Sequence, residues 1–96
     1  MYARVVSGSA RPDQLDELIQ LWQDSVAPSV KTRKGFKSAR LLVDRHTGRA
    51  MSVGFWAAQP DVQETSEWNR AQVAKFMELF IAPPSVEENY EIVVEV

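Results

Sequence analysis

Apolar residues recur in the first third of the chain with the spacing of an amphipathic α-helix. They stand at i, i+3, i+4, i+7 and i+11, as Leu15, Leu18, Ile19, Trp22 and Val26, and so form one stripe along a helix. Pro12 suits the first helical turn, and acidic residues follow it where the helix dipole favours negative charge. The pattern predicts a helix that begins near Pro12 and ends near Pro28.

Four other segments have the composition or the alternation of β-strands. Tyr2–Ser7 is rich in β-forming residues, and Tyr90–Val96 alternates with a period of two. Phe36–Asp44 and Arg49–Ala57 flank a polar bend that ends in Gly48, a residue able to adopt a positive φ. These two segments are predicted to form a β-hairpin.

A second helical segment is predicted between the hairpin and the last strand. Pro60 and Asp61 suit its first turn, and Pro83-Pro84 ends the region. Ser66 has the side chain of a helix cap, so we expect a break near it. The expected common face comprises Val62, Thr65, Asn69, Val73, Phe76, Met77 and Phe80.

The predicted element order, β-α-β-β-α-β, is that of the ferredoxin-like split βαβ fold. Right-handed crossovers place both helices on one face of an antiparallel four-stranded sheet with strand order 4-1-3-2. We therefore predict a single α+β domain over residues 1–96. Apolar residues of both parities occupy the strands, so the sheet face away from the helices needs a cover. A homodimer would supply one.

Composition narrows the classes of function. With 96 residues, 45% hydrophobic and 25% charged, the chain is expected to fold around one core. It has no cysteine, and its one histidine, His46, lies in the hairpin bend, so we expect neither a metal nor a cofactor. We find no membrane span or signal-peptide pattern and expect a cytoplasmic protein. The net charge of −2 argues against a nucleic-acid partner.

Charge is segregated along the chain. Residues 31–49 contain seven lysines and arginines against Asp44 alone, although the whole chain is slightly acidic. Lys37 and Arg40 fall on the second predicted strand, and Glu91 and Glu95 fall on the fourth. Because these strands are the two edges of the predicted sheet, opposite charges there favour pairing between two subunits over pairing of like edges.

The sequence resembles the antibiotic biosynthesis monooxygenase family. The resemblance is carried by Gly35-Phe36, Leu41–Asp44, Thr47–Arg49 and Val53–Trp56, and by the closing Tyr90–Val96. It extends over nearly the whole chain and implies a dimeric α+β barrel, in which the sheets of two subunits pack together with the helices outside. Most of these residues support the fold, so the resemblance specifies architecture more closely than chemistry.

The resemblance implies a cofactor-independent monooxygenase that acts on a small aromatic or quinol-type substrate. In that branch of the family, an asparagine and a tryptophan near the second helix orient a phenolic substrate, and Trp68-Asn69 has these residue types at a different spacing. The alternative for this pair is a packing role. The haem-degrading branch needs a histidine further along the helix, and 73–80 contains none.

Aromatic and thioether side chains could line a pocket for a flat ligand. The candidates are Trp22, Phe55, Trp68, Phe76 and Met77. Such residues also form ordinary cores, so two functions stay open. One is the monooxygenase, and the other is a non-catalytic barrel that binds a small ligand or serves in a stress response.

Overall fold

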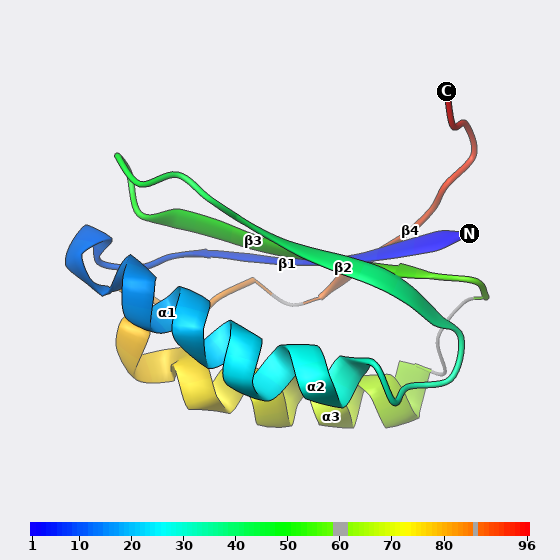
Figure 1. The fold of residues 1–96 in the computed structure, drawn as a ribbon, viewed down its shortest axis with the longest axis horizontal. Helices are drawn as coiled ribbons and strands as arrows, with labels where there is room; N and C mark the ends of the chain where they lie inside the picture. The colour runs from blue at the N-terminus through cyan, green and yellow to red at the C-terminus, as the bar shows by residue number, and fades with distance from the viewer. Residues whose placement is uncertain (59–61, 86) are drawn as a thin grey trace.

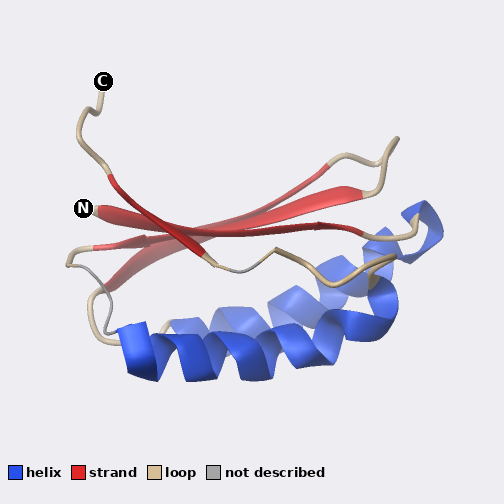
Figure 2. Ribbon diagram, turned by 180° about the vertical axis from the view of Figure 1, so that it is seen from behind, coloured by secondary structure: helices blue, strands red, loops and turns tan. Residues whose placement is uncertain are grey.

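The computed structural model describes residues 1–58, 62–85 and 87–96, with the backbone alone for 62–66. Four antiparallel strands form one sheet in the order β2-β3-β1-β4. They are β1 (Tyr2–Ser9), β2 (Phe36–Val43), β3 (Arg49–Trp56) and β4 (Glu88–Glu91). The helices all lie against one face of this sheet (Figures 1 and 2). The predicted ferredoxin-like fold and its strand order are therefore confirmed.

The first crossover is a single helical rod made of four segments of three helix types (Figure 1). A 3₁₀ turn at Pro12–Gln14 leads into α1 (Leu15–Leu21), a π-helical turn at Trp22–Val26 and α2 (Ala27–Val30). The prediction that the helix ends near Pro28 is thus slightly wrong. Proline has no N–H for the α-helical ladder, and the wider π-helical turn directly before α2 is a usual way to accommodate such a break.

The second crossover contains α3 (Val62–Phe76), followed by a 3₁₀ turn at Met77–Leu79. The helix is continuous through Ser66, so the predicted break is absent there, as serine is tolerated inside a helix at modest cost. The predicted start at Pro60 and Asp61 lies outside the described residues.

The last strand is displaced from its prediction and is shorter. β4 ends at Glu91, whereas Tyr90–Val96 was expected to pair throughout. Tyr2 pairs with Glu91, and Ile92 donates its N–H to the Met1 carbonyl at 2.8 Å. The C-terminal segment then leaves the sheet (Figure 1), so Glu95 lies outside the edge strand.

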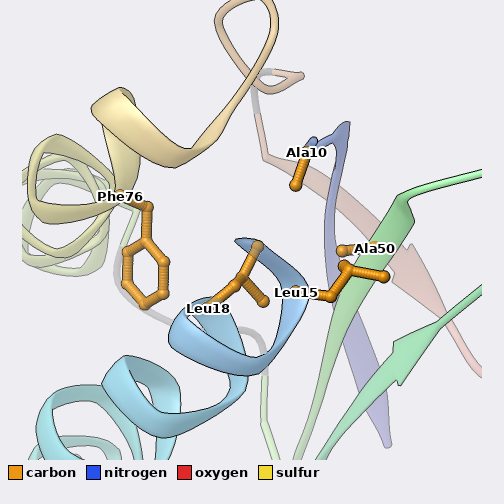
Figure 3. Packing of buried hydrophobic residues seen from close by; sticks show 5 residues of the cluster. All are labelled: Ala10, Leu15, Leu18, Ala50 and Phe76. Carbon is orange, nitrogen blue, oxygen red and sulfur yellow. The ribbon is translucent and has the colours of Figure 1, made fainter. Parts of the chain in front are cut away.

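The core lies between the sheet and the helices, toward the end where α1 begins. Its buried side chains are Ala10, Leu15, Leu18, Ala50 and Phe76. Figure 3 shows these side chains converging from α1, α3 and the sheet. Burying a leucine fully contributes about 1.5–3 kcal/mol, so this cluster fixes how the helices lie on the sheet.

The opposite sheet face is open. Leu42, Met51 and Tyr90 are exposed there, since their pairing positions alternate with those of the residues under the helices. The C-terminal segment also leaves the sheet on this side (Figure 1), and its Val93 and Val94 are exposed. Among the described residues, no helix has the length and apolarity that crossing a membrane requires.

Candidate functional site

A cavity of about 90 Å³ lies between the sheet and the helices. Its wall is almost entirely apolar, which suits an organic ring better than a polar metabolite. Every long element contributes to the wall. The lining includes Val6, Leu18, Trp22, Val26, Leu41, Trp56, Trp68, Val73, Phe76 and Phe80.

Four of the residues singled out in the sequence border this cavity. Trp22 comes from the π-helical turn of the first crossover, and Trp68, Asn69 and Phe76 come from α3. Trp68 and Asn69 are adjacent on α3 and so project about 100° apart. Both nevertheless line the cavity, together with Gln72, Val73 and Phe76, so a wide stripe of α3 faces it.

The structure places Phe55 and Met77 away from the cavity, against the sequence expectation. Side chains alternate along a strand, and the neighbouring Trp56 is the residue that faces the helices. Phe55 instead lies under the Arg40 guanidinium, whose central carbon is 5.9 Å from the ring centroid. Met77 begins the 3₁₀ turn after α3 and is 42% exposed.

Trp68 joins α3 to the end of the first crossover. Its indole Nε1 donates a 2.7 Å hydrogen bond to the Ser29 hydroxyl. The Arg33 guanidinium carbon lies 5.1 Å from the centre of the Trp68 ring, a cation–π geometry. The ring therefore borders the cavity, while the polar edge is held by the protein itself.

Asn69 is also engaged by the protein. Its Nδ2 donates to Glu87 Oε2 at 3.3 Å, which ties α3 to the segment before β4. Trp22 has a similar arrangement, since its Nε1 donates to the Ser52 hydroxyl at 3.2 Å. These bonds fix the side chains that a ligand would touch.

A buried amide completes the wall on the α3 side. The oxygen of Gln72 accepts a 2.9 Å bond from the Ser25 hydroxyl, and Lys75 Nζ donates to the same hydroxyl oxygen at 2.8 Å. These two hydrogen bonds connect α3 with the π-helical turn. They leave the buried Gln72 oxygen satisfied, as a stable interior requires.

Arg4 is the charged residue of the lining, and the sequence reasoning missed it. The side chain is only 5% exposed, and its Nε donates to Asn89 Oδ1 at 2.9 Å. Burial lowers the pKa of Arg4 from its ordinary value, and the nearby Glu87 carboxylate opposes this shift. The signal in the sequence was weak: a single arginine between apolar residues of a predicted central strand.

The other polar candidates have structural explanations. His46 lies in the exposed hairpin turn, where Asp44 Oδ1 accepts its backbone N–H at 2.9 Å. This contact is ordinary turn chemistry. Within the described ranges, no cluster of three or more His, Cys, Asp or Glu side chains is placed to hold a metal ion.

The fold, with a cavity between its sheet and helices, places the chain in a recognisable structural class. No protein-family model matches the sequence. The structure is similar to a monooxygenase from the gene ActVA-Orf6 of Streptomyces coelicolor, solved with the ligand nanaomycin D. The TM-score is 0.77 at 14% identity, over 99% of this chain and 89% of the other. A candidate antibiotic biosynthesis monooxygenase from Deinococcus radiodurans gives 0.75 at 15% identity, over 100% and 96%.

A Mycobacterium tuberculosis structure, Rv0793, gives a TM-score of 0.72 at 18% identity, over 98% of this chain and 96% of the other. The chain therefore has an antibiotic biosynthesis monooxygenase-like fold. In sequence, it is 43% identical over 60 residues to an uncharacterised protein of M. tuberculosis strain H37Rv, covering 62% of this chain. The chain spans about a quarter, 25%, of that relative's length.

Proposed function

We propose that the protein is a cofactor-independent monooxygenase of a small aromatic or quinol-type substrate, which binds in the cavity between the sheet and the helices. The observation that carries the proposal is the nearly apolar cavity bordered by Trp22, Trp68 and Phe76. Aromatic rings on its wall offer faces and edges against which a planar substrate can pack. The monooxygenases of this fold support the choice of reaction.

Such a reaction needs no external reductant when the substrate is electron-rich. A 1,4-dihydroxybenzene reacts with O₂ to give a hydroxylated quinone and water, so the ring supplies all four electrons. One oxygen atom enters the ring as the new hydroxyl oxygen, and the other leaves as water with two hydrogens. The protein's contribution is to hold the ring, exclude bulk water and stabilise its deprotonated form.

The size of the cavity favours a single-ring substrate. At about 90 Å³ it is smaller than the roughly 300–1,000 Å³ typical of sites for drug-sized ligands. A polycyclic phenol would need the helices to move apart. A single ring needs far less adjustment, because a dry cavity of about 150 Å³ is known to bind benzene.

Oxygen uptake with a panel of hydroquinones and polyketide phenols tests this function. We expect single-ring hydroquinones to consume one O₂ for each hydroxylated quinone formed, above a blank with heat-denatured protein. Trp68→Ala should lower the turnover at least tenfold, because Trp68 borders the cavity. Met77→Ala is the matched control, since Met77 lies outside the lining. Equal turnover by both variants would contradict the proposal.

The alternative is a barrel that binds a small aromatic ligand without chemistry. It is favoured by one observation: the polar groups of Trp68 and Asn69 are already bonded to Ser29 and Glu87. In that case the same panel binds, as seen by quenching of tryptophan fluorescence, but no substrate consumes oxygen.

We propose further that the molecule acts as a homodimer. The open sheet face exposes Leu42 and Met51, and a second copy presents the same apolar face to it under two-fold symmetry. Lys37 and Arg40 lie on edge strand β2, and Glu91 ends edge strand β4. Opposite charges on the two edges suit an arrangement that brings β2 of one subunit near β4 of the other.

A further inference from the structure

The unsatisfied hydrogen-bonding groups of the cavity wall are all donors. Arg4 Nη1 and Nη2 and Trp56 Nε1 are buried, and none has a hydrogen-bond partner among the residues that the structure describes. Both side chains line the cavity, and Trp56 is only 1% exposed. A buried donor without a partner is costly, so two such side chains in one small cavity indicate a missing acceptor.

The two side chains belong to the same end of the cavity. Arg4 on β1 pairs with Gly54 on β3, and Trp56 stands two residues further along β3, on the same face. A side-chain carbon at Gly54 would lie 3.1 Å from Trp56 Nε1. The indole N–H thus occupies the space over Gly54, directly beside the residue that pairs with it, Arg4.

The orientation of the Arg4 guanidinium is fixed at its Nε. Its Nε is held by Asn89, so the plane of the guanidinium is set while both terminal nitrogens stay available. Trp22 and Trp68 differ, because their N–H groups are bonded to serines. Of the tryptophans in the lining, Trp56 is the one whose donor is unpaired among the described residues.

We propose that Arg4 and Trp56 form an oxyanion-binding end of the cavity, which receives an anionic oxygen of a planar aromatic ligand, either a phenolate or a carboxylate. A guanidinium and an indole offer only donors, and charge-assisted bonds to an anionic oxygen are about twice as strong as neutral ones. Glu87 lies near enough to Arg4 to act on it electrostatically, which lowers the cost of a buried cation while the cavity is empty. The inference rests on the proposed function only in taking this cavity as the ligand site.

Binding of 4-nitrophenol under nitrogen tests the proposal, because its phenol ionises near neutral pH and its phenolate absorbs visible light. We expect the wild-type protein to bind the phenolate about tenfold or more tightly than the phenol, so the pKa of the bound ligand falls by about one unit or more. Benzoate against benzamide gives the corresponding comparison for a carboxylate. Preference for only one of the two anions identifies whether the site binds a phenolate or a carboxylate.

Arg4→Met should remove the preference for the anion, and Arg4→Lys should keep part of it. Arg11→Met is the matched control, because Arg11 is exposed in a loop, and it should bind as the wild type does. The melting temperature of Arg4→Met should equal or exceed that of the wild type, since the substitution removes unpaired buried donors. Its failure to fold would overturn the proposal by showing that the guanidinium is structurally required.

The wild-type measurements stand without any variant. Equal affinity for the charged and neutral forms, or no binding of any of the three compounds, would overturn the inference. Anion preference without oxygen uptake in the turnover assay would overturn the monooxygenase and leave the oxyanion site. Oxygen uptake without anion preference would overturn the oxyanion site and leave the monooxygenase.

Discussion

The side chains around the cavity divide by what their polar atoms contact. The indole N–H groups of Trp22 and Trp68 bond to Ser52 and Ser29, and these bonds hold the two rings in place. Arg4 and Trp56 keep donors that no described residue satisfies. The two bonded tryptophans therefore shape the cavity. Arg4 and Trp56 leave it with hydrogen-bond donors that have no acceptor among the described residues.

The bond between Trp68 and Ser29 can be measured as a coupling energy. Trp68→Phe keeps a ring beside the cavity and removes the N–H donor. We expect Ser29→Ala to lower the free energy of unfolding by about 0.5–1.5 kcal/mol in the wild type, and by almost nothing in the Trp68→Phe background. Urea denaturation of the four proteins gives the cycle.

Ser38→Ala is the control for that cycle, since Ser38 is exposed on β2. Its effect should stay within about 0.5 kcal/mol. Additive effects of Ser29→Ala and Trp68→Phe would show that the hydrogen bond does not stabilise the protein.

The sequence predicted the individual site residues less well than it predicted the secondary-structure elements and the fold. Trp22, Trp68, Asn69 and Phe76 do meet at one cavity, yet Phe55 points to the other face because a strand alternates strictly. Arg4 was overlooked because one charged residue in a strand reads as an outward-facing position. Only the register of β1 against β3 shows that this position faces inward.

At the scale of elements, the hairpin between β2 and β3 shows how one residue type sets a turn. Gly48 has a φ of +82°, and its N–H donates to the Asp44 carbonyl at 2.8 Å. A side-chain carbon there would lie 2.1 Å from the Ala10 carbonyl oxygen. The turn is thus packed against the end of β1 as well as being left-handed.

Two glycine substitutions separate backbone strain from crowding. Gly35 has almost the same φ, +81°, but nothing lies within 4 Å of the added carbon. We expect Gly35→Ala to cost about 1–2 kcal/mol through φ alone. Gly48→Ala should cost clearly more, because it must also displace Ala10. Thermal and urea unfolding of both variants measures the difference.

Equal losses for the two variants would mean that the contact with Ala10 relaxes freely. The comparison needs no assumption about the unfolded chain, because both substitutions change it alike.

Periodicity predicted the elements well because burial on one face imposes it. It located the strands of the hairpin nearly to the residue, since hydrophobic alternation and the turn glycine agree there. It failed at Pro28 and at the last strand, where the outcome depends on contacts that periodicity does not contain. A π-helical turn accommodates the proline, and β4 pairs with β1 only as far as Glu91, opposite Tyr2.

At the scale of the whole molecule, the two sheet faces differ sharply. One is covered by helices and the other exposes Leu42, Met51 and Tyr90. The ferredoxin-like order predicted this asymmetry from the sequence, because both crossovers fall on the same side. The sequence could not specify how a second copy is oriented on the open face, since an apolar surface is not directional.

The proposed homodimer predicts a specific response to surface substitutions. Leu42→Asp combined with Met51→Asp should convert the dimer to monomers, while circular dichroism stays unchanged, because both side chains lie on the open face. Met77→Asp is the control, since Met77 is exposed on the helical side. Sedimentation velocity at micromolar concentration distinguishes the states, and a monomeric wild type would contradict the dimer.

Charge reversal tests the orientation of the subunits. Lys37→Glu with Arg40→Glu should weaken association by about 1 kcal/mol or less for each pair, and adding Glu91→Lys should restore part of the loss. Glu95→Lys should restore less, because Glu95 lies beyond the end of β4. If none of these reversals changes the dimer affinity, β2 of one subunit does not lie near β4 of the other.

The position of β1 between β3 and β4 also sets an order of events during folding. β1 cannot receive its second neighbour, β4, until the ribosome has made residues 88–91, and closing so long a loop is slow. The hairpin of β2 and β3 needs only a short loop and can form early. Arg4 meets Asn89 across 85 positions of sequence, so its guanidinium is oriented only when the last strand docks. The cavity thus gains its oriented cation only when β4 docks, and a chain truncated before β4 would keep the hydrophobic walls and lose that orientation.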